Sequence, residues 1–188
     1  MATAGHRAAT GGLAINLRET KTSQHLKVAS GAFAEGDAIP SEFSDYECGK
    51  SFPLAWSEGP IGTRTYAVLI EDPDVHPAPG PFCHWLVWNI PARMTHLRAG
   101  VPPHGHLDEP AGALQGAAST GTVGYFGPRP PKGGPAHHYH VQVFAIDRVL
   151  DIPEGAERDE LVAAIGGHVL ASGELVGTYE RSTASAAP

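Results

Sequence analysis

Residues 127–147 read GPRPPKGGPAHHYHVQVFAID, a Pro/Gly-rich segment that runs directly into alternating polar and apolar residues. The first half predicts a loop, because proline has no N–H group to donate to the ladder of a central strand. In the second half apolar residues recur at every other position from Tyr139, which is the period of a β-strand. His140 and Gln142 lie on the other face of the predicted strand, so we expect that face to be the more hydrated one. The stretch therefore predicts a loop and a strand, with His137 and Tyr139 at their junction.

Two other segments also place acidic residues or histidines at the end of an apolar run. Residues 71–77 read EDPDVHP and follow the strand-like run 66–71. Residues 83–91 read CHWLVWNIP, in which His84 opens another strand-like run. Antiparallel pairing of these runs would bring their polar ends together. The sequence therefore predicts a small polar pocket at one end of a sheet.

The remaining elements indicate a mainly β domain. Strand-like runs are predicted at 13–17, 66–71, 83–90, 139–146 and 174–179. One helix is predicted at about 157–167, because Leu161, Ala164, Ile165 and His168 fall on one face and glycines 166 and 167 end it. Residues 108–115 predict either a helix or a turn. The helix near the C-terminus is expected to pack against the β-rich part.

The length and the net charge of the chain limit the number of domains and the classes of ligand that we expect. The 188 residues fit one domain, which we place at 13–182 between flexible tails at 1–12 and 183–188. The net charge of −7, without a basic stripe, argues against binding to nucleic acid or to an anionic membrane surface. The apolar runs are shorter than the ~20 residues that span a bilayer. The first residues lack the pattern of a secretory leader, so we expect a cytoplasmic protein without integral membrane association.

The cysteines and histidines do not predict a metal or a cofactor. Cys48 and Cys83 make neither a disulfide framework nor a zinc spacing. Eleven histidines are unusual for this length, and they gather at His104 and His106 and in the HHYH of residues 137–140. These clusters come without an evident acidic or cysteine partner for a metal site. A solvated loop explains the first pair more simply than a metal site.

Taken in order, these segments resemble the phosphatidylethanolamine-binding protein family, in particular its bacterial Raf-kinase-inhibitor-like branch. The resemblance covers about residues 13–182 and depends on the DPD at 72–74, His84 in HWLVWNIP, GPRPPKGGPAHHY, and LASGELVGTYER at 170–181. It implies a β-sandwich of antiparallel sheets with one or two short helices near the C-terminus. It also implies an anion pocket for phosphate-bearing head groups or phosphorylated residues. A protein partner and a homodimer are further implications.

The resemblance and the residue chemistry together predict the lining of this pocket. His84 and His137 can each supply a charged donor when protonated, Tyr139 supplies a hydroxyl, and residues 127–134 supply backbone N–H groups. Asp72 would orient an imidazole, raise a histidine pKa, or accept from an ammonium or hydroxyl group of a ligand. The predicted ligand-binding residues are Asp72, Asp74, His84, Gly127, Pro130, Pro131, His137 and Tyr139.

Two finer expectations concern the surroundings of the pocket. Asp74 is expected to cap or brace its loop, and one of Trp85 and Trp88 is expected to line the pocket while the other joins the core. The chain also departs from the family pattern, because Val75-His76-Pro77 follows the DPD where the family usually has Ala-Pro. The inserted histidine changes the predicted rim and leaves the identity of the ligand open.

Three functions remain open at this point. The first is noncatalytic binding of a small anionic or phosphorylated ligand, with modulation of a partner protein as an extension. The second is a cofactor-independent isomerase, cyclase or lyase of a biosynthetic pathway, whose acid–base residues would come from Asp72, His76, His84 and Tyr139. Covalent catalysis is not predicted, because no GxSxG elbow or catalytic cysteine signature is present. The third, inhibition of a protease or kinase, follows from the family name alone.

Overall fold

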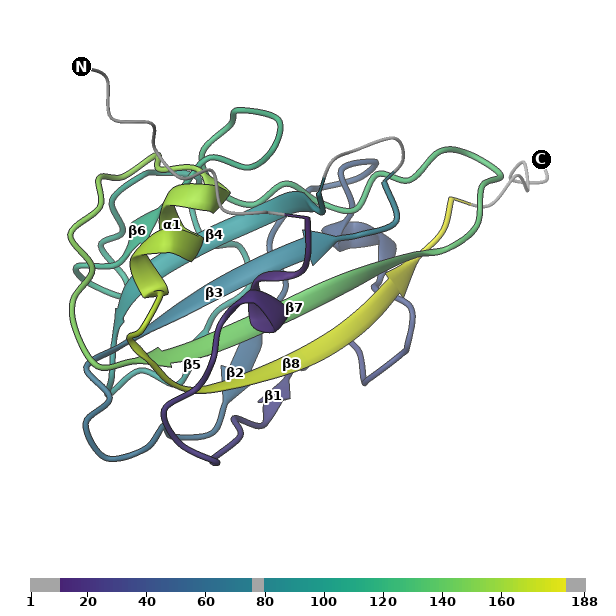
Figure 1. The fold of residues 1–188 in the computed structure, drawn as a ribbon. Coiled ribbons are helices and arrows are strands. Elements are labelled where there is room, and N and C mark those ends of the chain that lie inside the picture. The colour runs from purple at the N-terminus through teal and green to yellow at the C-terminus, as the bar shows by residue number, and fades with distance from the viewer. Residues whose placement is uncertain (1–10, 76–79, 182–188) are drawn as a thin grey trace, which may run out of the picture.

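The computed structural model describes residues 11–75 and 80–181, and these form two antiparallel sheets. The larger sheet has five strands in the order β6-β4-β3-β7-β8, and the smaller one has three in the order β1-β2-β5. Figure 1 shows the small sheet behind the large one, with the helical segments η1 and α1 on the opposite, front face. The elements are η1 (Ala14–Leu17), β1 (Val28–Ala29), η2 (Ser41–Phe43), β2 (Leu54–Trp56), β3 (Thr65–Asp72), β4 (Phe82–Pro91), β5 (His96–Leu97), β6 (Leu114–Gln115), β7 (His137–Ile146), α1 (Arg158–Ile165) and β8 (Val169–Tyr179).

The large sheet is covered on both faces, so its central strands carry continuous apolar runs. Every residue of β3 is buried, and successive side chains enter two separate core clusters. Val68 packs with Trp56 and Trp85 between the two sheets. Leu69 packs with Trp88 and the residues of α1 on the other face. Both tryptophans of β4 are therefore core residues, and the expectation that one of them lines the pocket is wrong.

Most predicted elements are present with shifted ends, but residues 13–17 do not form a strand. They form the 3-10 turn η1, because buried side chains of the large sheet hold its backbone N–H groups. The Ala14 N–H donates to Glu71 Oε2 at 2.8 Å, and the Ile15 N–H donates to Gln142 Oε1 at 2.6 Å. A strand would need a neighbouring strand as the partner for these groups. The two side chains take that place.

A buried polar cluster joins the front face of the sheet to α1. Glu71 is fully buried and forms an ion pair with Arg158 of α1, while the Gln142 amide donates to Glu71 Oε2 at 2.5 Å. Arg158 Nη2 also donates to the Gly12 carbonyl at 2.6 Å. Gln142 is thus completely buried, so the prediction of a wetter face on this side of β7 is wrong at this position. A polar residue fits this buried position because the Gln142 amide forms hydrogen bonds with Glu71 and with the backbone of η1.

The helix lies within the predicted range but is shorter. A capping box starts it, in which Glu157 accepts from the backbone of Glu160 and the Glu160 side chain accepts from the Glu157 N–H. Leu161 and Ile165 are buried against the sheet as expected, whereas His168 lies beyond the end of the helix. Gly167 has a positive φ of 75°, which favours glycine just after a helix. Of the segment 108–115, for which a helix or a turn was predicted, residues 108–112 form a turn and Leu114–Gln115 form strand β6.

We expect Glu71→Gln to lower the free energy of unfolding by about 3 kcal/mol, because it leaves the charge of Arg158 without its buried partner. Urea unfolding measures the change. Asp151→Asn is the matched control, since Asp151 is exposed and the same loss of one charge there should cost less than about 0.5 kcal/mol. Equal unfolding midpoints for the two variants would contradict a structural role of the ion pair.

Candidate ligand-binding pocket

A pocket of about 510 Å³ lies where β3 ends and where β4 and β7 begin. Asp72, the last residue of β3, pairs with Phe82, the first residue of β4, and Glu71 pairs with His140 near the start of β7. This is the right-hand end of the large sheet in Figure 1. The antiparallel register thus brings together the three segments that the sequence singled out. The lining residues are Asp72, Asp74, Val75, Phe82, His84, Thr120, Phe126, Arg129, Pro131, Pro135, His137 and Tyr139.

Two of the predicted ligand-binding residues support the pocket without lining it. A Cβ at Gly127 would lie 2.5 Å from the Asp45 nitrogen and from the Phe43 oxygen, so glycine permits a close approach of two backbones there. Pro130 is buried, and its carbonyl accepts a hydrogen bond of 2.6 Å from the Tyr46 hydroxyl. His76 lies outside the described residues.

Several lining residues escaped the sequence analysis. Phe82 and Phe126 form an aromatic wall with His84, and their ring centroids lie 4.7 Å and 5.7 Å from the imidazole. Phe126 directly precedes Gly127, the first residue of the predicted loop, so its place in the sequence could have indicated that it lines the pocket. Thr120 comes from a separate turn, and nothing in its surrounding sequence indicated the pocket.

Asp72 is the polar centre of the pocket. It is 1% exposed, and its Oδ2 lies 2.7 Å from Nδ1 of His137. Its Oδ1 accepts from the backbone N–H of Asp74 at 2.8 Å. Because an ionised carboxylate only accepts, the His137 Nδ1 carries a hydrogen and Nε2 is the remaining polar atom of that ring. Asp72 therefore orients His137, which is one of the roles that the sequence suggested for it.

His84 differs from the expectation of a charged donor. Its Nδ1 lies 2.8 Å from the Phe126 carbonyl and must donate to it, since a carbonyl oxygen only accepts. Burial lowers the pKa of His84 to about 4, even though the Phe126 carbonyl and Asp72 act in the opposite direction. The ring is therefore neutral near pH 7, and its Nε2 carries a lone pair rather than a proton.

Tyr139 contributes a buried hydroxyl to the pocket end of the sheet. The residue is 1% exposed, and among the described residues its buried hydroxyl has no hydrogen-bond partner. Burial raises the pKa of Tyr139 above its usual range, the charge of Asp72 adds to this shift, and the nearby backbone of Arg129 opposes it, although its geometry falls short of a hydrogen bond. The group is thus a neutral donor in contact with the pocket. A buried polar group without a partner costs folding free energy, so its presence calls for an explanation.

The histidines of β7 do have acidic partners, contrary to the sequence analysis. Asp74 Oδ2 accepts from both the backbone N–H and Nδ1 of His138, each at 2.8 Å. Partial burial opposes ionisation of Asp74, but these contacts with His138 lower its pKa overall. His140 pairs with Glu174 of β8 at 2.9 Å. The partners were missed because they come from distant segments. Asp74 braces the end of β3 against β7, as expected.

The loop before β7 is held on both sides. Besides the hydrogen bond from Tyr46 to Pro130, the Gly133 N–H donates to the Arg181 carbonyl at 2.9 Å. The guanidinium of Arg181 lies 4.0 Å from the centroid of the Tyr46 ring. These contacts join the loop to the segment after η2 and to the segment after β8.

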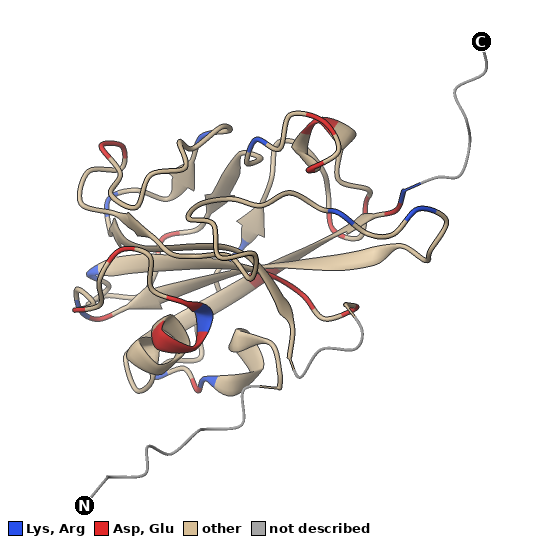
Figure 2. Ribbon diagram, turned by 90° about the horizontal axis from the view of Figure 1, so that it is seen from above, with Lys and Arg blue, Asp and Glu red and all other residues tan. Residues whose placement is uncertain are grey.

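The same loop contains Lys and Arg residues, whose positions on the ribbon are blue in Figure 2. Arg129 lines the pocket and is 59% exposed, and its Nη1 lies 2.9 Å from Oδ2 of Asp45. Lys132 is also exposed. The rim therefore carries a cation, which is paired with Asp45, in a chain of net charge −7.

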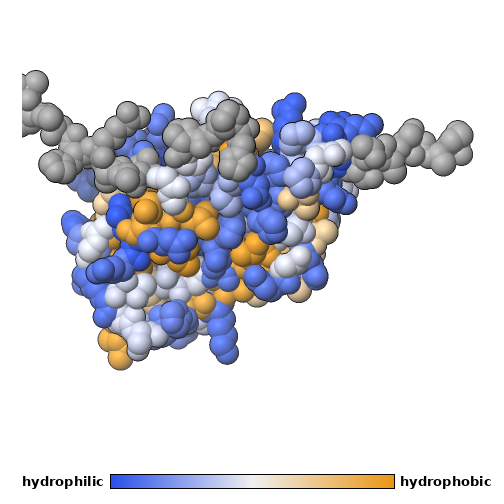
Figure 3. Space-filling model, turned by 45° about the vertical axis from the view of Figure 1, so that its right-hand side comes forward, coloured by the Kyte–Doolittle hydropathy of each residue, from blue (hydrophilic) through white to orange (hydrophobic). Residues whose placement is uncertain are grey.

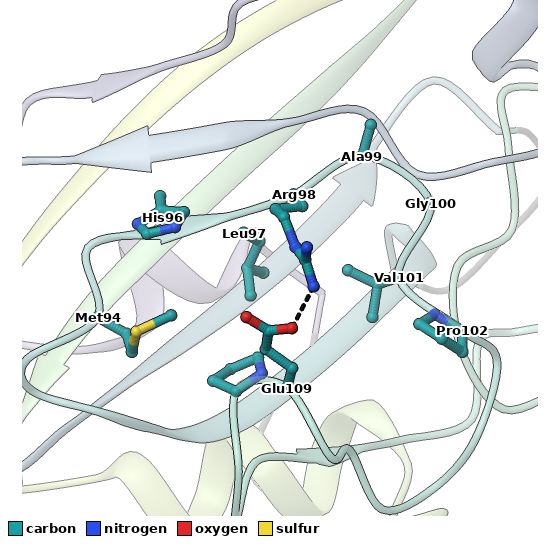
Figure 4. A pocket seen from close by; sticks show the side chains of 10 residues that line it. Met94, His96, Leu97, Arg98, Ala99, Gly100, Val101, Pro102 and Glu109 are labelled. Atoms are coloured by element: carbon teal, nitrogen blue, oxygen red, sulfur yellow. Dashed lines mark hydrogen bonds and ion pairs between the residues drawn. The ribbon is translucent and has the colours of Figure 1, made fainter.

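A smaller pocket of about 270 Å³ lies beside β5. Figure 4 shows that Arg98 and Glu109 point toward one another across it, and they form an ion pair. Its charged groups thus satisfy each other, in contrast to the unpartnered hydroxyl of Tyr139. We therefore treat the pocket at Asp72 as the candidate site.

The described residues contain neither a cluster of metal ligands nor a helix that could cross a membrane. Within 11–75 and 80–181, no three His, Cys, Asp or Glu side chains gather as the ligands of a metal ion would. No helix in the same ranges combines the length and the apolar character that crossing a bilayer requires. On the face shown in Figure 3, apolar areas are interrupted by polar residues.

Comparison with known proteins agrees with the fold and with the resemblance of the motifs. Residues 29–180 match the family model described as phosphatidylethanolamine-binding protein. A UPF0098 protein of Pyrococcus horikoshii is 40% identical over 157 residues, which are 83% of this chain and 77% of that protein. The crystal structure of E. coli YbcL has a TM-score of 0.77 at 28% identity and covers 84% of this chain and 99% of that chain.

A homologue of phosphatidylethanolamine-binding protein from Chlamydia trachomatis has a TM-score of 0.74 at 34% identity, over 85% of this chain and 99% of that chain. The chain belongs to the phosphatidylethanolamine-binding protein family, in the branch that contains the UPF0098 proteins and YbcL.

Buried Tyr139 and partly buried Tyr125 provide a first test of the site. Tyr139→Phe should raise the free energy of unfolding by roughly 1 kcal/mol, because it removes a buried hydroxyl that has no partner. Tyr125→Phe should lower it by about 1 kcal/mol, because the Tyr125 hydroxyl donates to the Phe43 carbonyl at 2.9 Å. Urea unfolding of both variants measures the difference. Equal losses of stability would mean that Tyr139 has a partner within the protein.

The protonation of His84 provides a second test. The unfolded ring binds a proton near its ordinary pKa of 6.5, whereas the folded ring does so only near pH 4, so the unfolded state binds more protons between these values. The folded state should therefore lose up to roughly 3 kcal/mol of stability as the pH falls through this window. NMR titration of the ring and urea unfolding of wild type and His84→Gln measure the effect. A His84 ring that titrates near pH 6.5 would contradict it.

Proposed function

We propose that this pocket binds a small ligand through a phosphate or similar anionic group, and that the protein acts by binding. The observation that carries the proposal is the buried hydroxyl of Tyr139, which has no partner among the described residues and contacts the pocket. Such a donor is satisfied when an acceptor arrives from outside the protein. Oxygen atoms of an anionic group are strong acceptors.

The surrounding groups support the same ligand chemistry. The Asp72 carboxylate fixes the ring of His137, so this imidazole is oriented before a ligand arrives. Arg129 on the rim adds a cation within reach of the mouth. Because buried Asp72 already holds the His137 ring, ordering this ring costs less binding free energy than ordering a mobile side chain.

The rest of the ligand would meet an apolar surface. Phe82, Phe126, Pro131 and Pro135 line the pocket beside its polar end. A ligand with an anionic group at one end and an apolar or aromatic group next to it fits this division. The family description names a phospholipid, whose head group carries a phosphate, and this is consistent with the proposal.

The acid–base enzyme remains a hypothesis. Its motivating residue, His76, lies outside the described residues, so the structure adds nothing on that side. The dyad of Asp72 and His137 is compatible with proton transfer, but it equally orients a binding group. We therefore keep binding as the proposed function.

Calorimetric titration with phenyl phosphate tests the proposal, since this probe combines the anionic and aromatic groups. Tyr139→Phe should weaken binding roughly three- to tenfold, the loss expected for one hydrogen bond. Tyr125→Phe is the matched control, because it removes a hydroxyl that is bonded within the protein, and it should bind like the wild type. Absence of phenyl phosphate binding at millimolar concentration would refute the proposed function.

A further inference from the structure

The polar end of the pocket brings hydrogen-bond acceptors close together. His84 Nε2 and Asp72 Oδ2 lie 4.0 Å apart, and both residues are almost completely buried. Because Nδ1 of His84 donates to the Phe126 carbonyl, Nε2 of the neutral ring is an acceptor. Two acceptors cannot bond to each other. A hydrogen supplied by a third group would satisfy them.

This arrangement conflicts with the simplest kind of anion. A fully deprotonated group would place its charge next to the Asp72 carboxylate. Two like charges in such close contact repel more strongly in a buried site than in water, because the effective dielectric constant is lower there. His137 contacts the same Oδ2 at 2.7 Å and offsets part of this repulsion when it is charged. His84, whose Nε2 presents a lone pair, does not.

A ligand that carries its own proton removes the conflict. A hydroxyl on the anionic group can donate to Asp72 Oδ2 and form a short, charge-assisted O–H···O⁻ hydrogen bond. The remaining oxygens of the group can then accept from the Tyr139 hydroxyl. The hydroxyl of the ligand would thus meet an acceptor, and one of its other oxygens would meet a donor. A phosphate monoester can carry such a proton near neutral pH, because its second ionisation occurs near pH 6.

We propose that the pocket selects the singly protonated form of a phosphate monoester, whose P–OH donates to Asp72 while its other oxygens accept from Tyr139. This inference rests on the proposed function and adds the hydrogen that the ligand must bring. It predicts discrimination against anions of the same shape that have no such hydrogen. A sulfate monoester is the matched example, since it stays unprotonated over the pH range in which proteins are stable.

The test compares phenyl phosphate with phenyl sulfate by calorimetry at about pH 6, where close to half of the phosphate ester is protonated. Wild type should bind phenyl phosphate at least about tenfold more tightly than phenyl sulfate. Asp72→Asn should reduce this ratio to about threefold or less, because a side-chain amide can donate to a sulfate oxygen. Asp151→Asn, which removes one exposed carboxylate after the far end of β7, should keep the wild-type ratio.

The outcomes separate the two proposals. Equal affinity of the wild type for both esters would overturn the selection of a protonated ligand and leave the proposed function standing. Absence of binding by both esters would overturn the proposed function itself. If Asp72→Asn fails to fold, ³¹P NMR of phenyl phosphate bound to the wild type decides. We expect the ³¹P chemical shift of the bound ester to stay at the value of the monoanion at a pH at which the free ester is the dianion. A bound chemical shift at the value of the dianion would refute the inference.

Discussion

The fold and the candidate site both depend on how β3 ends. This strand is buried on both faces, yet its last two residues are Glu71 and Asp72, and each carboxylate needs a partner. Side chains of a strand alternate, so the two acids leave on opposite faces. Glu71 pairs with Arg158 and joins α1 and η1 to the sheet. Asp72 pairs with His137 and becomes the centre of the pocket. One residue thus stabilises the fold and its neighbour organises the site.

Short-range patterns in the sequence were sufficient for the four long strands β3, β4, β7 and β8 and for the position of the pocket, because a period of two and a proline-rich loop are local features. The short strands β1, β2, β5 and β6 have only two or three residues each and were not predicted. The partners were not predictable in this way. His137 and Asp72 are 65 residues apart, and η1 forms because Glu71 and Gln142 hold its backbone. The neutrality of His84 also escaped prediction, since it depends on burial, which no local sequence pattern reports.

The charge of the whole chain does not describe the site. A net charge of −7 makes the long-range field unfavourable for an anion, but this field is screened beyond about 8 Å at physiological ionic strength. Recognition in the pocket would therefore depend on short hydrogen bonds and on the cation of Arg129 at the rim. Discrimination among anions would then depend on whether an oxygen of the ligand carries a hydrogen.

The attachment of the loop before β7 has a kinetic consequence. Tyr46 holds the Pro130 carbonyl on one side, and the Arg181 carbonyl holds the Gly133 N–H on the other. A wall of the cavity that is anchored on both sides does not need to open and close for each binding event. On this side, exchange of an occupant would be limited by diffusion and by the removal of water, so occupancy could follow rapid changes in ligand concentration.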